Sequence, residues 1–245
     1  MVSIRITGLA TLPEIRSGDI LAPLILAAAA REQQRITRST IVVVAQKIVS
    51  KAEGSTIDLA GIEPSSFAAT WAAQWGKDAR LIELVLRQSR RIVRMDRGVL
   101  ITETHHGFVA ANAGVDRSNT PGDDMATVLP SDPDASAAAL MAALDCGAVI
   151  ISDTFGRPWR EGLVNVAIGV SGIGPLEDLR GTQDRGGHAL SATILARADE
   201  LASAAGLVMG KSAGVPVVLI EGYEWEPCEG SARPLIRPPE FDLFR

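Results

Sequence analysis

Aspartate, threonine and arginine gather directly after an apolar run in the middle of the sequence. Residues 148–151 predict a buried strand that delivers Asp153 and Thr154 into a turn, with Arg157 and Arg160 just beyond. A carboxylate and a hydroxyl suit a hard divalent cation, and arginines suit phosphate or carboxylate groups. The alternative interpretation is an aspartate that caps a turn beside solvated arginines.

A second polar cluster strengthens the interpretation as a metal site. Residues 107–110 predict another apolar strand, and Asn112, Asp116, Ser118 and Asn119 follow it closely. Metal-bridged phosphoryl transfer needs carboxylates, because the bound cation must neutralise charge as the terminal phosphoryl group moves. Two aspartates at strand ends therefore predict a site of this kind.

Two glycine-rich segments match nucleotide-binding motifs only in part. Residues 206–212 contain three residues between their glycines where a P-loop needs four, and they follow a helical pattern where a P-loop follows a strand. Residues 169–174 have their glycines in the wrong order for a dinucleotide fingerprint. Both motif interpretations are disfavoured, and we interpret residues 169–174 as a glycine-rich turn.

Further elements must position these clusters. Apolar runs predict interior strands at residues 41–45 and 215–220. The spacing of apolar residues over 64–90 predicts two short amphipathic helices broken at Gly76. Residues 91–102 predict a hairpin with an Asp-Arg-Gly turn.

The second half of the chain adds helices and an irregular end. Helices are expected over residues 136–144 and 189–207, and the prolines after Gly222 predict an irregular arm. Strands and helices do not alternate regularly, which favours an α+β fold over a doubly wound sheet.

Composition narrows the classes of partner. The 245 residues carry 24 Lys and Arg against 29 Asp and Glu, a net charge of -5, so we expect no nucleic-acid partner. The longest apolar stretch, residues 20–30, is about half the length that a membrane span requires, so we expect no membrane association. Val2, Ile4 and Ile6 alternate as in a first strand and do not resemble a signal peptide, which predicts a cytoplasmic protein.

Four motifs together resemble one known family. They are residues 48–54 (IVSKAEG), 114–119 (GVDRSN), 151–159 (ISDTFGRPW) and 167–172 (AIGVSG). In order and spacing they resemble the coenzyme F420-0:L-glutamate ligase family, also called F420 gamma-glutamyl ligase, from about residue 12 to about residue 222.

The resemblance implies an enzyme that uses GTP and a divalent metal. Such a ligase adds L-glutamate to coenzyme F420-0 through a γ-linked peptide bond in coenzyme F420 biosynthesis, by way of an acyl phosphate, with further glutamates as an extension. Mn²⁺ or Mg²⁺ is the implied cation, and K⁺ is an additional candidate. Two alternatives stay open: a related amino-acid ligase for a modified F420 precursor, and a non-catalytic homologue that binds nucleotide or deazaflavin.

The resemblance also implies an architecture. The family fold has mixed, largely antiparallel sheets with flanking helices, and it forms an intertwined homodimer. Residues 1–245 would then be a single catalytic unit, with two interleaved subdomains as a variant of that organisation. The chain is too short to include the flavin-dependent reductase domain that is appended in some relatives.

The family's functional residues carry over onto matching positions. The implied catalytic residues are Asp116, Asp153 and Arg157, and the implied metal ligands are Asp116, Asp153 and Thr154. The implied nucleotide-binding residues are Leu12, Pro13, Glu14, Ile15, Gln46, Lys47, Lys51, Asn119, Met209, Gly210, Lys211, Ser212 and Gly214.

Lys211 departs from the family pattern. Some members place an acidic metal ligand at this position, in the glycine-rich loop of residues 206–215. A charged ammonium cannot ligate a cation, but it pairs well with a nucleotide phosphate. We therefore expect Lys211 to lie beside the phosphates.

Overall fold

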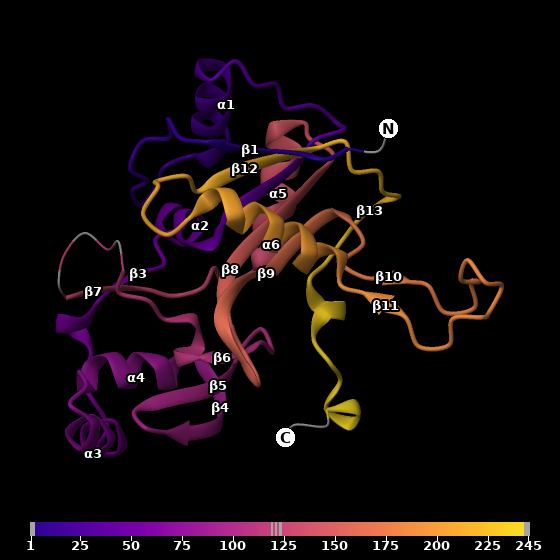
Figure 1. Cartoon of the computed structure of the whole chain (residues 1–245). Helices are drawn as coiled ribbons and strands as arrows, with labels where there is room; N and C mark the ends of the chain where they lie inside the picture. Colours follow the sequence, from indigo (N-terminus) through magenta and orange to yellow (C-terminus); the bar gives the residue numbers. More distant parts are fainter. Residues whose placement is uncertain (1–2, 119, 121, 123, 243–245) are drawn as a thin grey trace.

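A six-stranded sheet forms the framework of the protein (Figure 1). The computed structural model describes residues 3–118, 120, 122 and 124–242. In spatial order the strands are β1 (Arg5–Leu9), β12 (Val217–Glu221), β2 (Ile41–Ala45), β8 (Ala148–Arg157), β9 (Arg160–Ile173) and β13 (Pro227–Cys228). Within this sheet β2 and β8 run parallel and the other neighbours run antiparallel. The predicted α+β class, with mixed and largely antiparallel sheets, is confirmed.

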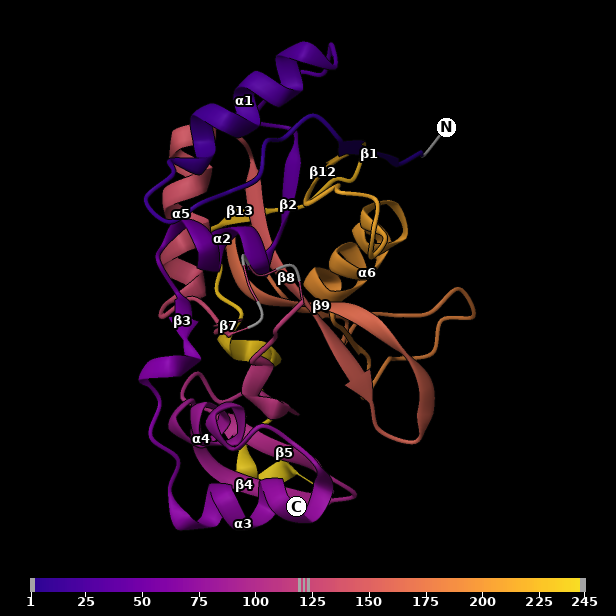
Figure 2. The same ribbon diagram turned by 90° about the vertical axis from the view of Figure 1, so that its left-hand side faces the viewer.

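Helices cover both faces of this sheet (Figure 2). The helices α1 (Leu21–Arg31), α2 (Gln46–Ala52) and α5 (Pro133–Leu144) lie on one face, and α6 (Arg197–Met209) lies on the other. Side chains alternate along a strand, so Val42 and Val44 of β2 join the apolar core under α1, α2 and α5, while Ile41 and Val43 join the core under α6. Every one of these four side chains is fully buried, which explains the continuous apolar run in the sequence.

Residues 56–127 build a smaller lobe at one end of the sheet (Figures 1 and 2). It has its own apolar clusters, one of them centred on Trp71 and Leu100. Its elements are β3 (Thr56–Asp58), η1 (Leu59–Gly61), α3 (Ser66–Trp75), α4 (Ala79–Arg87), β4 (Ser89–Asp96), β5 (Val99–Thr104), β6 (Val109–Ala111), η2 (Asn112–Gly114) and β7 (Met125–Thr127). The organisation as one catalytic unit stays a prediction.

Several predicted elements occur where the sequence places them. The two helices over residues 64–90 are α3 and α4, and Gly76 ends α3 in the left-handed conformation at φ 61°. The predicted hairpin is β4–β5, with Arg97 and Gly98 both at positive φ in its turn. The helix expected over residues 136–144 is α5, which begins at Pro133 and is capped by the Asp132 side chain.

The helix predicted over residues 189–207 is wrong in its first part. α6 begins at Arg197, and β11 (Ile194–Leu195) instead pairs with β10 (Glu177–Asp178). Asp199 and Glu200 in the first turn of α6 favour a helix start at this point, because carboxylates stabilise the amino end of a helix. The chain after Gly222 is irregular as expected, with β13 and the short helices η3 (Arg233–Leu235) and η4 (Pro239–Phe241).

The long β8–β9 hairpin corrects two further predictions. Asp153 and Thr154 do not enter a turn, because β8 continues to Arg157 by pairing with β9. Residues 169–173 are not a glycine-rich turn but the last part of β9. Local composition suggested a turn, whereas long-range pairing extends both strands.

No helix in the described part of the chain is long and apolar enough to cross a lipid bilayer.

A close approach of α5 to β9 explains the glycine inside β9. A Cβ atom at Gly169 would lie 2.3 Å from the Pro133 carbonyl oxygen, which is too close for any side chain. We expect Gly169→Ala to lower the free energy of unfolding by about 1–3 kcal/mol, because α5 must shift away from the sheet. Gly61→Ala is the matched control, since a Cβ there would meet no atom within 4 Å. Urea unfolding measures both, and equal stabilities of the two variants would contradict this packing.

Candidate functional site

The candidate site lies where β2 ends beside a longer β8. The parallel pairing of these strands stops at Ala45 and Ser152, and β8 continues as the edge of the β8–β9 hairpin. Asp153 and Thr154 follow directly, with side chains on opposite faces of the strand. Because β2 no longer covers this edge, both side chains line the same cavity.

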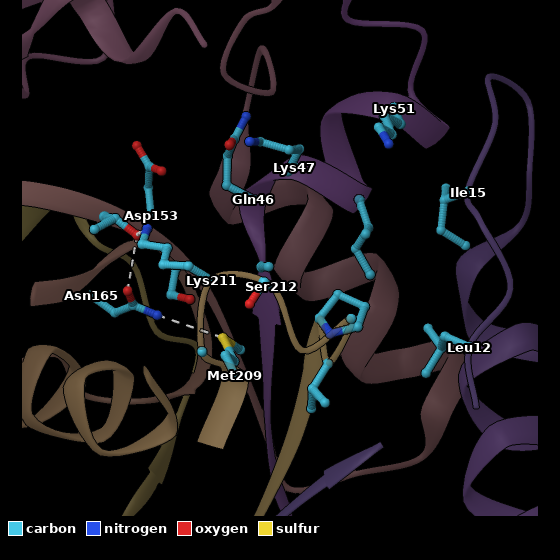
Figure 3. Close-up of a pocket in the computed structure, with 18 of the residues that line it drawn as sticks. Leu12, Ile15, Gln46, Lys47, Lys51, Asp153, Asn165, Met209, Lys211 and Ser212 are labelled. Carbon is cyan, nitrogen blue, oxygen red and sulfur yellow. Dashed lines mark hydrogen bonds between the residues drawn. The ribbon is translucent and has the colours of Figure 1, made fainter. Parts of the chain in front are cut away.

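The cavity has a volume of about 530 Å³ and gathers residues from distant parts of the chain. Figure 3 shows Leu12 and Ile15 on one side and Asp153, Asn165 and Lys211 on the opposite side. The cavity therefore has an apolar end and a polar end. The predicted site residues that line it are Leu12, Pro13, Glu14, Ile15, Gln46, Lys47, Lys51, Asp116, Asp153, Thr154, Met209, Gly210, Lys211, Ser212 and Gly214.

Asp116 reaches this cavity from the smaller lobe and meets a lysine there. The Lys47 ammonium donates to Asp116 Oδ2 at 2.8 Å and also to Ser118 Oγ at 2.6 Å. Burial alone would raise the pKa of Asp116, but the hydrogen bonds from Lys47 and from the Ser118 amide outweigh it and lower that pKa. Asp116 is thus held as a carboxylate.

Asp153 has the opposite electrostatic setting. Burial raises the pKa of this carboxyl to about 6, and the nearby negative charge of Asp116 adds to the increase. The positive charges of Lys211 and Lys47 act in the other direction without cancelling it. The carboxyl of Asp153 is therefore short of positive partners.

Lys211 points into the polar end of the cavity. Its ammonium donates to Thr154 Oγ1 at 2.7 Å, and Thr154 donates in turn to Asn165 Oδ1 at 3.0 Å (Figure 3). The loop that carries Lys211 starts later than expected, because Gly206 and Met209 belong to α6. Gly210 and Gly214 adopt positive φ, which lets the chain turn back toward β12.

Residues of α2 and the amino-terminal loop form the other wall. The side chain of Lys51 is 9% exposed and its ammonium pairs with Glu14 at 2.5 Å. Gln46 lines the cavity, but its amide donates to Ser50 Oγ and to the Val128 carbonyl. These contacts make Lys51 a buried cation beside the cavity and make Gln46 an anchor for α2.

Two predicted site residues are not placed in the cavity by the structure. Arg157 lies at the end of β8, and its guanidinium donates to the carbonyl groups of Glu161 and Gly162 in its own hairpin. It does not line the cavity. Asn119 lies outside the described residues, so its predicted contact with nucleotide stays a prediction.

Sequence reasoning missed two polar residues of the cavity wall. Asn165 belongs to β9, and Ser152 of β8 has a buried hydroxyl without a hydrogen-bond partner in the structure described. The sequence signal for Asn165 is an amide in the middle of the apolar run of residues 163–168. A polar side chain at such a position needs a hydrogen-bonding partner or a ligand.

The polar end of the cavity fits a metal that shares its ligands with a phosphate. In the part of the chain that the structure describes, no three His, Cys, Asp or Glu side chains gather to hold a metal. Asp116 and Asp153 still supply two carboxylates, and Thr154 supplies a hydroxyl oxygen. Mg²⁺ in proteins is commonly held by one or two carboxylates, with phosphate oxygens and water completing its shell.

Comparisons with known proteins agree with the motifs in the sequence. The family described as F420-0:Gamma-glutamyl ligase matches residues 10–222. The chain is 45% identical to the "Coenzyme F420:L-glutamate ligase" of Methanothermobacter thermautotrophicus over 100% of both chains. It is 47% identical to the protein of the same name from Methanopyrus kandleri, over 95% of this chain and 94% of that protein. The chain therefore belongs to the F420-0:gamma-glutamyl ligase family, and the resemblance inferred from the four motifs is confirmed.

The raised pKa of Asp153 predicts how stability changes with pH. Between about pH 4 and pH 6 the folded protein keeps a proton that the unfolded chain has lost, so stability falls as pH rises through this range. Asp153→Asn removes this loss. We expect the variant to be more stable than the parent at pH 7, on the order of 2 kcal/mol, and the difference to shrink toward pH 4.

Asp116→Asn is the matched contrast. The pKa of Asp116 is lowered, so its contribution to stability is present above the ordinary pKa and is lost as pH falls. We expect Asp116→Asn to be less stable than the parent at pH 7. Thermal unfolding without added metal or nucleotide measures both variants, and a lower melting temperature for Asp153→Asn at pH 7 would contradict the account of Asp153.

Proposed function

We propose that the chain is a GTP- and divalent-metal-dependent ligase that joins L-glutamate to coenzyme F420-0 through a γ-linked peptide bond. One observation carries the proposal: two carboxylates and two lysines meet at the polar end of one cavity in a member of this family. The names of the relatives, coenzyme F420:L-glutamate ligase, support the two substrates. The lysines and carboxylates of the cavity support a nucleoside triphosphate as the source of energy.

The two ends of the cavity suit the two parts of a nucleotide. Leu12 and Ile15 offer apolar contacts for a base, and the ammonium groups of Lys47 and Lys211 at the polar end offer positive charge for phosphates, with Lys51 as a further cation on the wall of α2. Lys51 is already neutralised by Glu14, and Lys47 by Asp116. Phosphate binding would thus exchange carboxylate partners for phosphate oxygens, without exposing a bare buried cation.

The reaction balances in two steps. The acceptor carboxylate of the F420 precursor attacks the terminal phosphorus of GTP, which forms an acyl phosphate and releases GDP. The amine of L-glutamate then attacks the acyl carbon, releases phosphate and forms the amide after loss of a proton. The lysines that face the cavity stabilise the negative charge of the moving phosphoryl group.

Asp116, Asp153 and Thr154 are the residues that would hold Mn²⁺ or Mg²⁺. The cation would supply charge neutralisation at the phosphate oxygens and would help orient the terminal phosphoryl group. The high pKa of Asp153 fits this role, because a buried carboxyl without enough positive partners gains most from a cation. Lys47 keeps Asp116 ionised before the cation binds.

A homodimer is part of the proposal. The β8–β9 hairpin projects away from the sheet (Figure 2). Near its tip, Trp159 and Leu163 are 77% and 64% exposed. Exposed large apolar side chains on a projecting element are typical of a surface that another chain covers. This feature supports the dimer that the family resemblance implies.

Mass spectrometry of the products tests the proposed reaction. Purified protein with F420-0, L-glutamate, GTP and Mn²⁺ is expected to form F420-0 extended by one or more glutamates, with release of GDP and phosphate. Asp153→Asn should lower kcat about 100-fold or more, because it removes a charge that acts on the transition state. Asp96→Asn, on the exposed β4–β5 turn, is the control that should keep parental turnover. Activity of Asp153→Asn within about threefold of the parent would contradict the role of Asp153.

Lys211→Ala separates nucleotide binding from metal binding. Loss of a charged hydrogen-bond donor at the phosphates should raise the KM for GTP about tenfold. The Mn²⁺ concentration for half-maximal activity should change much less, since an ammonium is not a metal ligand. A two-dimensional titration of GTP against Mn²⁺ measures both, with Lys77→Ala in the smaller lobe as the control. An unchanged dependence on GTP would mean that Lys211 does not contact nucleotide.

A further inference from the structure

Asn165 of β9 connects three parts of the cavity wall. It pairs directly across the hairpin with Thr154 of β8. Its Oδ1 accepts the Thr154 hydroxyl at 3.0 Å, and its Nδ2 lies 3.5 Å from the Met209 sulfur at the end of α6 (Figure 3). The amide of Asn165 thus bridges a candidate metal ligand on one side and a thioether on the other.

The chemistry of these partners fixes which way the amide points. A thioether sulfur accepts hydrogen bonds and cannot donate them, so the NH₂ group must face Met209. The carbonyl oxygen then faces Thr154, and the Thr154 hydroxyl must donate its hydrogen bond to Asn165 Oδ1. The lone pairs of Thr154 Oγ1 remain for the cavity, where the ammonium of Lys211 already uses one at 2.7 Å.

Packing holds the amide in this position. A Cβ atom at Gly206 of α6 would lie 3.1 Å from both Cγ and Nδ2 of Asn165, which is tighter than ordinary van der Waals contact, so α6 packs closely against this side chain. The Ser203 hydroxyl donates to the main-chain carbonyl of Asn165 at 2.7 Å. Asn165 is wedged between β9 and α6 and has little freedom to turn.

We infer that Asn165 is a positioning residue that fixes the Thr154 hydroxyl with its lone pairs toward the cavity. Held in this way, Thr154 Oγ1 directs its lone pairs toward cationic groups, and its hydroxyl does not donate a hydrogen bond to a phosphate. The ammonium of Lys211 uses this oxygen in the structure, and a divalent cation would use the same oxygen when bound. The inference rests on the proposed function for the cation, while the direction of the hydroxyl follows from Thr154, Asn165 and Met209 alone.

Loss of the Asn165 amide should weaken cation binding without removing a ligand. A hydroxyl that lacks its acceptor can turn its hydrogen into the cavity, where it opposes a cation. Partners that orient a metal ligand typically change metal affinity by about 10- to 100-fold when they are replaced. The expected change lies in metal affinity, which a loss of packing alone would not alter in the same selective way.

The test measures Mn²⁺ affinity in the presence of GDP, by the electron paramagnetic resonance signal of free Mn²⁺. Asn165→Leu keeps the approximate size but removes the acceptor, and we expect about tenfold weaker binding. Asn165→Ala is the second acceptor-free variant, in case leucine does not fit beside Gly206. Asn165→Asp keeps an acceptor for Thr154, so it should bind Mn²⁺ within about threefold of the parent or more tightly.

A double-mutant cycle shows whether Asn165 acts through Thr154. Thr154→Val removes the hydroxyl, and adding Asn165→Leu to it should change Mn²⁺ affinity by less than about twofold. Thr70→Val is the matched control, because it removes an exposed hydroxyl that donates to the Ser66 carbonyl within α3 of the smaller lobe, and it should leave affinity unchanged. Parental affinity in both acceptor-free variants, additive effects in the cycle, or no Mn²⁺ binding by the parent would each overturn the inference.

The readout is independent of the proposed reaction. If the binding changes appear as expected while the parent forms no glutamylated product, the positioning role stands and the proposed function fails. If product forms and Asn165→Leu binds Mn²⁺ like the parent, the proposed function stands and the positioning role fails.

Discussion

Two aspartates face one cavity, and the structure must offset both their mutual repulsion and their loss of water. Lys47 neutralises Asp116 directly at 2.8 Å, whereas Asp153 has only more distant positive charges and keeps a raised pKa. The site is therefore left with an incomplete balance of charge. Under the proposed function, a bound divalent cation would complete this balance and would bring phosphate oxygens beside the two carboxylates. The raised pKa of Asp153 means that its ionisation lowers stability, and the proposed function gives a reason for this cost.

The rest of the fold explains how these charges come together. β2 ends at Ala45 while the parallel strand β8 continues, so an uncovered strand edge carries Asp153 and Thr154. The smaller lobe brings Asp116 to the same edge. Its main chain forms an antiparallel β-bridge there with Thr127 of β7. The loop after α6 closes the polar end with Lys211. Each wall comes from a different segment, so the cavity exists only when the whole sheet is assembled.

The sequence predicted which residues line the cavity better than it predicted how they are arranged. The four motifs contain Lys51, Asp116 and Asp153, the family resemblance added Lys211, and all four line the cavity. The sequence did not predict that Asp153 lies inside a strand, because the pairing of β8 with β9 extends the strand beyond the apolar run of residues 148–151. The strand that contains Gly169 was misjudged for the same reason, whereas the start of α6 follows the acidic residues Asp199 and Glu200 of its first turn. Lys47 was expected at nucleotide, and its bond to Asp116 depends on contacts that no local pattern encodes.

Diffraction from crystals grown with Mn²⁺ and GDP tests the central claim most directly. The account predicts an anomalous Mn²⁺ peak within bonding distance of the carboxylates of Asp116 and Asp153 and of Thr154 Oγ1. It also predicts that the ammonium of Lys47 leaves Asp116 and that the ammonium of Lys211 turns from Thr154 to a phosphate. Mn²⁺ bound elsewhere, or GDP bound with the Lys47–Asp116 pair intact and no Mn²⁺ beside Asp153, would contradict the account.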